Sequence, residues 1–338
     1  MAGMNENHDR ASSGMIHLVT GGTGLVGNNV IRTLLGQGRK VRALVREHCD
    51  PRPLADLDVE LTQGDLTQAD RMQRACQDVG AVVHAAGYLH IGWTGLEKAR
   101  AINVEGTRHV AEAARQSGAK MVHVSSVDAL GIGSADQPAD EDSPRVGKVE
   151  CPYVISKREA EQVVLAEVEK GLDASIVNPA YMFGPWDWKP SSGRMLLEVA
   201  QRFTPIAPFG GCSVCDVRDV AKGIVAALDR GKKGRHYILA GENMSFFDLW
   251  KMLAQVAGSS GPWMRAGPAM RIVGGSCGDL WTRFSKTEAD VNSAAVAMSS
   301  LFHYYNSSRA EKELGYCRSS PLQAVQDAWQ WFCDNGYT

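Results

Sequence analysis

The sequence lacks three features that would assign it to a specialised class of protein. No run of about 18 or more apolar residues occurs among its 338 residues, so no membrane span is expected. There is no basic excess, since the net charge is −2, and this argues against a nucleic-acid partner. Eight cysteines are too sparse for a disulfide scaffold of this length, which favours a reducing cytoplasm as the location.

Two further features are absent locally. The first fourteen residues are polar and have no apolar core of the kind that a secretory signal needs, so we expect residues 1–14 to form a disordered leader. Cys212 and Cys215 are a close pair, but no second pair or histidine cluster accompanies them in the sequence. No metal site is therefore predicted.

What the sequence does contain is a strand, a glycine-rich turn and a helix, in that order, over residues 16–36. Glycine permits a tight turn and a close backbone approach, and a helix N-terminus offers free N–H groups and a partial positive charge. The order predicts a cradle for the phosphates of a dinucleotide, and a glycine turn without a ligand is the alternative. The residues of the predicted cradle are Thr20, Gly21, Gly22, Thr23, Gly24, Leu25, Val26 and Gly27.

Strands continue to alternate with helices along the chain, which predicts an α/β fold with a doubly wound parallel sheet. The expected strands after the first are 40–45, 59–63, 81–86, 121–124, 174–178 and 235–240. We expect a dinucleotide-binding Rossmann domain over residues 15–180, with 213–240 returning to it. A smaller, discontinuous substrate-binding region would cover residues 181–212 and 241–338.

The end of the second strand indicates which cofactor binds. An acidic residue there would bond the ribose 2′-hydroxyl of NAD, whereas an arginine accommodates the 2′-phosphate of NADP. Val45 stands in the place of the acid and Arg46 follows it, which favours NADP(H). Glu47 keeps NAD(H) open as an alternative. Arg42 could assist unless the alternation of the strand points it elsewhere.

Other strand ends predict further cofactor contacts, because ligands bind at the carboxyl edge of open parallel sheets. Asp65, followed by Leu66, is placed to touch the adenine amine, although capping the next helix would use the same carboxylate. The small residues Ala85, Ala86 and Gly87 would let the backbone approach the cofactor, as would simple core packing. Pro179 ends a later strand at the same edge.

Three residues form the predicted catalytic set. Tyr153 and Lys157 are four residues apart, so on a helix they share one face, and Ser126 ends a strand of the sheet. A phenol is a poor acid–base group at neutral pH unless a nearby cation stabilises its phenolate, and a lysine ammonium does so. A serine hydroxyl can donate to the oxygen of a substrate carbonyl.

Together these motifs resemble the extended short-chain dehydrogenase/reductase family, and the segment Val41-Arg-Ala-Leu-Val-Arg46 resembles its NADP-using dihydroflavonol 4-reductase-like branch. The resemblance spans nearly the whole chain. It implies Tyr153 as general acid/base, Lys157 as its partner and ribose ligand, and Ser126, in preference to Ser125, as the carbonyl donor. It also implies Asn103 as a cofactor contact that supports the proton relay, unless this side chain only braces nearby backbone. The resemblance rests on the segments Thr20–Gly27, Asp65, Ala85–Gly87, Asn103–Thr107, Ser125-Ser126 and Tyr153–Lys157.

The expected function is an NADP(H)-dependent oxidoreductase that moves a hydride between nicotinamide and a ketone or secondary alcohol of a small molecule. The segment Ser125-Ser-Val-Asp128 departs from the Thr-Asp-Glu set of the family's dehydratases, which disfavours sugar dehydration. A nucleotide-sugar epimerase with tightly bound NAD and a non-catalytic nucleotide sensor remain the alternatives. The aromatic loop Tyr181–Arg194 either covers the substrate or packs on its own region. The sequence leaves open whether the chain forms a homodimer.

Overall fold

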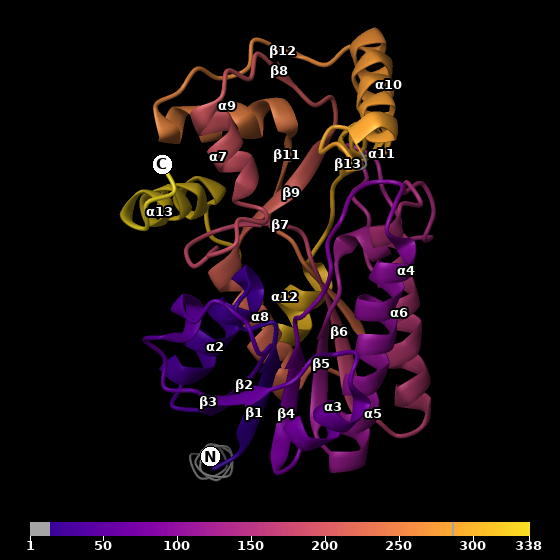
Figure 1. Ribbon diagram of the computed structural model, residues 1–338, viewed down its shortest axis with the longest axis vertical. Coiled ribbons are helices and arrows are strands. Elements are labelled where there is room, and N and C mark those ends of the chain that lie inside the picture. Colours follow the sequence, from indigo (N-terminus) through magenta and orange to yellow (C-terminus); the bar gives the residue numbers. More distant parts are fainter. Residues whose placement is uncertain (1–13, 286) are drawn as a thin grey trace.

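The computed structural model describes residues 14–285 and 287–338, so the predicted leader lies outside the described residues except for Gly14. A seven-stranded parallel sheet fills the lower half of the molecule in Figure 1, with the strand order β10-β6-β5-β4-β1-β2-β3. The chain builds outward from β1 to β3 and then crosses to the other side of β1, which confirms the predicted doubly wound α/β fold. The strands are β1 (Ile16–Thr20), β2 (Lys40–Val45), β3 (Glu60–Gln63), β4 (Val79–His84), β5 (Lys120–Val124), β6 (Ala174–Pro179) and β10 (His236–Leu239).

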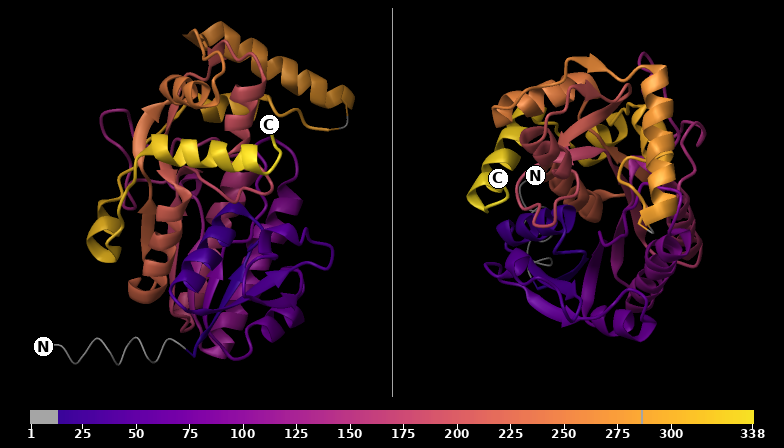
Figure 2. Two further views of the ribbon diagram at one scale, coloured as in Figure 1. Left: turned by 90° about the vertical axis from the view of Figure 1, so that its left-hand side faces the viewer. Right: turned by 45° about the horizontal axis from the view of Figure 1, so that its top comes forward.

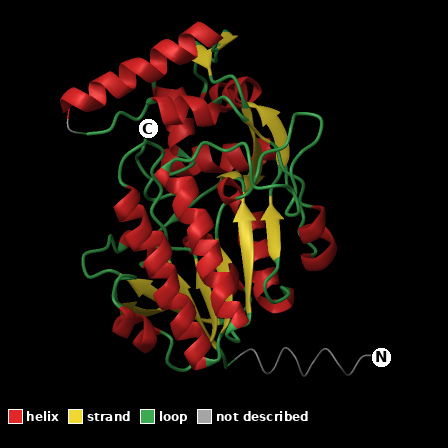
Figure 3. Cartoon of the chain, turned by 90° about the vertical axis from the view of Figure 1, so that its right-hand side faces the viewer, coloured by secondary structure: helices red, strands yellow, loops and turns green. Residues whose placement is uncertain are grey.

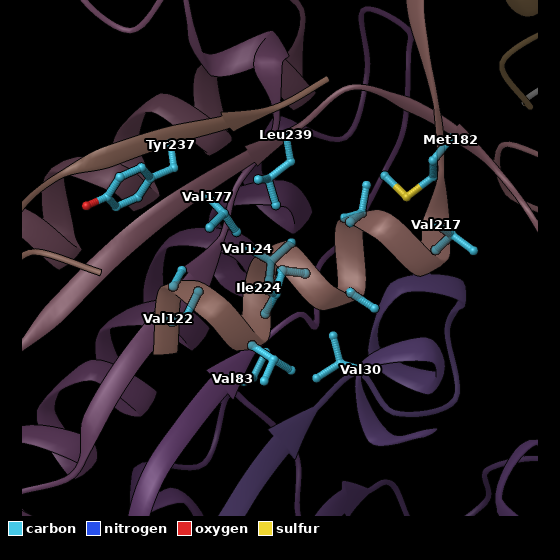
Figure 4. Close-up of a cluster of buried hydrophobic side chains, with 14 of the residues drawn as sticks. Val30, Val83, Val122, Val124, Val177, Met182, Val217, Ile224, Tyr237 and Leu239 are labelled. Atoms are coloured by element: carbon cyan, nitrogen blue, oxygen red, sulfur yellow. The ribbon is translucent and has the colours of Figure 1, made fainter. Parts of the chain in front are cut away.

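Helices cover both faces of this sheet, as Figure 3 shows from the side. The faces differ because consecutive residues of a strand point to opposite sides. Val83 of β4 joins the cluster under α2 and α8, and Val82 joins the cluster under α3, α5 and α6. Figure 4 shows the first cluster, in which Ile224 of α8 lies among strand valines. The helices are α2 (Leu25–Gly36), α8 (Val217–Arg230) and α12 (Ser308–Leu314) in the first layer, and α3 (Ala69–Ala75), α5 (Gly106–Ser117) and α6 (Pro152–Glu169) in the second.

A second region lies beyond the carboxyl ends of the large sheet (Figure 2). Its core is a four-stranded sheet in which β9 (Gly211–Asp216) pairs with β7 (Tyr181–Phe183), β11 (Glu242–Ser245) and β13 (Phe302–His303). Helices α7 (Arg194–Gln201), α9 (Phe246–Ala257) and α13 (Pro321–Asp334) share its apolar cluster. The other elements are α4 (Leu96–Ala99), β8 (Ile206–Ala207), β12 (Met264–Arg265), α10 (Pro268–Ser285) and α11 (Ser293–Ser299). Short 3₁₀ helices lie at Arg52–Leu54 and Val127–Ala129, and a π-helical stretch at Arg100–Glu105 joins α4 to α5.

The structure differs from the sequence expectation at the return to the large sheet. Residues 213–240 were expected to rejoin it together, but β9 belongs to the four-stranded sheet and β10 to the large one. The break falls at Asp216, whose carboxylate accepts the N–H of Arg218 (2.7 Å) and so caps α8. Likewise, Tyr181–Phe183 at the start of the loop expected to be irregular forms β7. The domain boundaries themselves remain a prediction.

Among the described helices, none is long and apolar enough to span a membrane.

Candidate active site

The glycine turn after β1 brings backbone to the edge of a cavity. Gly21 has φ +75°, and a Cβ there would lie 2.6 Å from the nitrogen of Ala86. A Cβ at Gly27 would lie 2.3 Å from the carbonyl oxygen of Gly21. Gly24 precedes α2 and has no side chain to cap it, so the first N–H groups of the helix stay open to a ligand. These positions require glycine and fit a bound phosphate.

Not every residue of the predicted cradle faces the cavity. Gly21, Gly24, Leu25, Val26 and Gly27 line it. Thr20 is buried behind the turn, where its hydroxyl bonds His84 Nδ1 (2.7 Å) and accepts the N–H of Ala86 (3.2 Å). At Gly22 a Cβ would lie 2.6 Å from Ile31 Cδ1, so this glycine serves helix packing. Thr23 is half-buried beside the cavity and is not among its lining residues.

The adenosine end of the predicted site lies at the tips of β2 and β3. Arg46 is exposed, and its positive charge helps to lower the pKa of the Asp65 carboxyl group. Asp65 accepts the N–H (3.0 Å) and hydroxyl (2.7 Å) of Thr67, and these bonds lower the pKa of its carboxyl group. The carboxylate thus closes the turn before α3 and does not cap the helix itself, whose N-cap residue is Gln68.

The side chains of two other residues at this end make contacts away from the predicted adenosine site. Arg42 donates to Glu60 (2.8 Å) and to the carbonyl of Gln77 (2.7 Å), so it points away from Arg46. The side chain of Leu66 is buried in the core under α3 and α5. Only the backbone of Leu66 could face an adenine ring.

A cavity of about 550 Å³ lies between the carboxyl edge of the large sheet and the second region. The predicted residues Ala85, Gly87, Ser126, Tyr153, Lys157 and Pro179 line it together with the glycine turn. The far wall comes from the second region, through residues that include Cys212, Phe246, Met298 and His303. Ala86, Arg46, Asp65, Leu66 and Asn103 are not among the lining residues.

Helix α6 carries the two predicted proton-handling residues, and Pro152 occupies its first turn. Tyr153 and Lys157 are both buried. Burial raises the pKa of Tyr153, the charge of Asp128 raises it further, and a hydrogen bond with Ser126 opposes the rise. Burial lowers the pKa of Lys157 to about 8 against the charge of Glu161, and its Nζ donates to the carbonyl of Val124 (3.1 Å). The phenol is therefore protonated at neutral pH.

The two serines at the end of β5 differ in their bonds. Ser126 Oγ accepts the N–H of Asp128 (3.1 Å), which fixes the oxygen and leaves the hydroxyl hydrogen free to donate. Ser125 Oγ is buried at the cavity wall and has no partner among the described residues. Both hydroxyls are thus available to a bound molecule, and Ser126 is the one near enough to Tyr153 to lower the pKa of its phenol.

Asn103 braces backbone in this structure. Its amide donates to the carbonyl of Tyr88 (2.9 Å) and to Ser156 Oγ (3.0 Å), and its oxygen accepts the N–H of Tyr88 (2.7 Å). These bonds hold the strand-end segment after Gly87 against α6. This is the bracing role that the sequence left as the alternative.

The aromatic loop packs on its own region and also on two arginines of the predicted dinucleotide-binding domain. Arg32 lies over the Trp186 ring (3.3 Å to its centroid) and Arg52 over the Trp188 ring (5.6 Å). Trp186 and Trp188 lie against Trp331, with ring centroids 6.2 and 5.0 Å apart. Arg194 pairs with Asp290, so it does not face the cavity. The loop contributes only its two ends to the cavity lining, through residues 181–182 and 191–192.

One charged cluster at the cavity was not found from the sequence. Lys148 Nζ donates to Asp128 (2.7 Å) and to His303 Nδ1 (2.5 Å), and His303 Nε2 then donates to the carbonyl of Met298 (2.8 Å). Burial would raise the pKa of the Asp128 carboxyl group, but the charge of Lys148 lowers it well below its usual range. The cluster ties the serine turn to the far wall. Its members are up to 175 residues apart in the chain, and no local spacing pattern signals it.

The fold and the cavity define a dinucleotide-binding enzyme of the Rossmann type, with a polar group at the end of β5 and a tyrosine and lysine on α6. Residues 17–240 match the model of the NAD dependent epimerase/dehydratase family, and the chain belongs to this family. It is accordingly an NAD(P)-dependent oxidoreductase of the short-chain dehydrogenase/reductase type, as the sequence predicted.

The relatives extend over nearly the whole chain. A putative dihydroflavonol 4-reductase from Synechocystis sp. is 36% identical over 94% of this chain and 95% of its own. Sterol demethylase protein B from Methylococcus capsulatus is 32% identical over 95% of this chain and 99% of its own. The crystal structure of a protein called gox2253 superimposes with a TM-score of 0.83 at 38% identity, covering 95% of this chain and 98% of the other.

Proposed function

We propose that the protein is an NADP(H)-dependent carbonyl reductase or alcohol dehydrogenase that uses Ser126, Tyr153 and Lys157. The observation that carries this proposal is that all three side chains line one cavity together with the glycine turn. The close-packed glycines and the open N-terminus of α2 fit a dinucleotide pyrophosphate. When bound, the nicotinamide supplies or accepts a hydride.

In the reductive direction, the protein's residues handle the substrate oxygen. Ser126 donates to the carbonyl oxygen and stabilises the charge that develops as the carbonyl carbon gains the hydride. The protonated phenol of Tyr153 then gives its proton to the same oxygen, which completes the alcohol. Lys157 supports the resulting phenolate electrostatically and offers its remaining N–H bonds to the nicotinamide ribose. In the oxidative direction the proton returns to Tyr153.

The preference for NADP(H) rests on Arg46. It is exposed at the tip of β2, whereas Arg42 is tied to Glu60, so Arg46 is the arginine available to a 2′-phosphate. A phosphate at that position would gain a charge-assisted bond. Asp65 and Leu66 would border the adenine through the turn that Asp65 caps.

The substrate class that we favour is an apolar, ring-shaped carbonyl compound. Phe246, Met298 and Cys212 give the far wall an apolar character. Two relatives carry names that refer to a dihydroflavonol and a sterol, and both words denote ring compounds. Residues 181–216 and 241–338 would bind this substrate, and residues 15–180 with 217–240 the cofactor, since all of β9 belongs to the second sheet.

The test is consumption of NADPH with a panel of ring ketones and of open-chain ketones matched in size. Turnover with ring ketones, and the reverse reaction with NADP and the matching alcohols, is the expected result. The epimerase alternative predicts a different outcome: purified protein retains NAD, and a nucleotide sugar changes its stereochemistry without net NADPH consumption. That outcome would refute the proposal.

A further inference from the structure

Helix α10 (Pro268–Ser285) turns its glycines to the protein and its large apolar side chains to the outside, the reverse of an ordinary surface helix. Its two buried residues are Gly275 and Gly278, which lie against the segment at the start of α11. At Gly278 a Cβ would lie only 1.7 Å from the carbonyl oxygen of Val291. A surface helix of a globular protein normally turns its apolar stripe to the core. Here the contacts with the protein are made by the glycines and by polar side chains such as Asp279 and Thr282.

The large apolar side chains of α10 face outward instead. Trp281 is 64% exposed and Phe284 is 80% exposed. Val273, Leu280 and Phe284 follow one another at helical spacing and make one stripe, with Met270, Ile272 and Trp281 exposed beside it. A contiguous exposed apolar face of this kind marks a contact with another molecule or with a membrane.

A second exposed aromatic pair lies at the same end of the molecule. Phe203, ahead of β8, packs edge-on against Trp263, ahead of β12, with ring centroids 5.2 Å apart. Both rings are more than 60% exposed. Figures 1 and 2 show that β8, β12 and α10 form the end of the molecule that lies away from the large sheet. Two aromatic groups therefore project from one end.

The charges on α10 and β12 are mostly positive. Three arginines, at 265, 271 and 283, stand against one aspartate, Asp279, in a chain whose net charge is −2. The Asp279 carboxylate accepts the N–H of Ser293 (3.0 Å) and so faces α11. Arg265 is exposed and lies 3.9 Å from the Asp248 carboxylate, and Arg271 lies over the Phe209 ring. Arg283 is exposed and makes no ion pair with the described residues. Trp and Phe on one face with flanking cations are typical of helices that lie in a membrane interface, where anionic headgroups attract arginine.

The same charges disfavour a second copy as the occupant. A two-fold interface brings the same patch of both copies together, so the arginines of one copy would meet those of the other. On α10 itself no carboxylate is available to pair with an arginine of the second copy, since Asp279 accepts the N–H of Ser293. Asp248 already lies beside Arg265 of its own copy. An anionic surface satisfies both the apolar stripe and its cationic rim.

We propose that α10 docks the protein on the surface of an anionic phospholipid bilayer, with Trp281 and Phe284 in the boundary between headgroups and acyl chains. The helix lies in the plane of the surface and does not span the bilayer. Its inner side rests on α11, which supplies Ala295, Met298 and Ser299 to the cavity lining. The docked surface is thus separated from the cavity by one helix. The proposal does not depend on which reaction the cavity catalyses.

The test is sedimentation of the full chain with vesicles of phosphatidylglycerol and, separately, of phosphatidylcholine. We expect the wild-type protein to pellet with phosphatidylglycerol, and the Trp281→Ser/Phe284→Ser variant to bind at least about tenfold more weakly. The matched control is Leu61→Ser/Leu322→Ser, which removes two exposed leucines far from α10 and should bind like the wild type. Arg283→Glu should weaken binding, and Trp281→Phe should retain it. Unchanged thermal unfolding and dinucleotide binding establish that the variants are folded.

Three results would overturn the proposal. The α10 variant could pellet as well as the wild type, or phosphatidylcholine could bind the wild type as tightly as phosphatidylglycerol. The wild type could also ignore both vesicles. In that case, light scattering would show whether it is a dimer that Trp281→Ser/Phe284→Ser dissociates, which would assign the α10 face to a second copy.

Discussion

The two walls of the cavity are built in different ways. The cofactor wall consists largely of backbone, brought close by glycines that follow one strand within a few residues. The opposite wall consists of side chains from segments that are far apart in the chain, such as Cys212, Phe246 and His303. A backbone wall is little altered when side chains change, whereas a side-chain wall can be changed one residue at a time. The following predictions test that contrast, beginning with the largest expected effect.

The cofactor wall should not tolerate a single methyl group. In Gly27→Ala the new Cβ would meet the carbonyl of Gly21, which is backbone and cannot move aside easily. We expect dinucleotide affinity to fall by more than about 100-fold, because the turn must open and its N–H groups then no longer point at the pyrophosphate. Fluorescence titration with NADPH measures the loss.

Gly36→Ala is the matched control, since nothing lies within 4 Å of a Cβ at the end of α2. It should bind NADPH like the wild type. Equal binding by both variants would contradict the backbone cradle.

The link between the walls should matter most for stability. Lys148→Met leaves the Asp128 carboxylate without its buried cation, and breaking such a pair costs about 3–5 kcal/mol of unfolding free energy. Urea denaturation measures the cost. Lys222→Met removes an exposed lysine from its pair with the buried Asp219, whose carboxylate keeps the N–H of Ser319, and should cost below about 1 kcal/mol. A similar cost for both variants would show that the cluster does not hold the walls together.

The side-chain wall should affect substrate and not cofactor. Met298→Ala removes apolar volume from the cavity lining, and we expect KM for the preferred ring ketone to rise by about tenfold while the Kd of NADPH stays unchanged. Met252→Ala trims a methionine of the second region that does not line the cavity, and it should leave KM unchanged. A parallel change in the Kd of NADPH would mean that the two walls are not independent.

The exposed end of the cofactor wall should give the smallest effect. Arg46→Ala removes the guanidinium available to a 2′-phosphate, so we expect NADPH affinity to drop by about tenfold with little change for NADH. Arg42→Ala should not alter the ratio of the two affinities, because Arg42 is bonded to Glu60 and to backbone carbonyls. An unchanged ratio in Arg46→Ala would remove the basis for NADP selection.

The same contrast explains what the sequence could predict. The strands of the large sheet, the glycine turn and the Tyr153–Lys157 spacing follow local rules, in which neighbours in the chain decide the structure. The assignment of β9 to the second sheet and of β10 to the large sheet does not follow local rules. Which sheet each strand joins is decided by partner strands that are remote in the sequence. The Lys148–Asp128–His303 cluster is equally non-local. The direction in which α10 faces depends on which of its sides packs against the start of α11. The hydrophobic pattern alone would turn the apolar side inward.

The most direct test of the proposed chemistry is to measure kcat for ring-ketone reduction and the Kd of NADPH together in Tyr153→Phe. This variant removes one hydroxyl from a buried ring and leaves the packing of α6 in place. We predict that kcat falls by about 10²–10⁴-fold while the Kd of NADPH changes by less than about threefold. An unchanged kcat would contradict the account, because the proton would then come from another group.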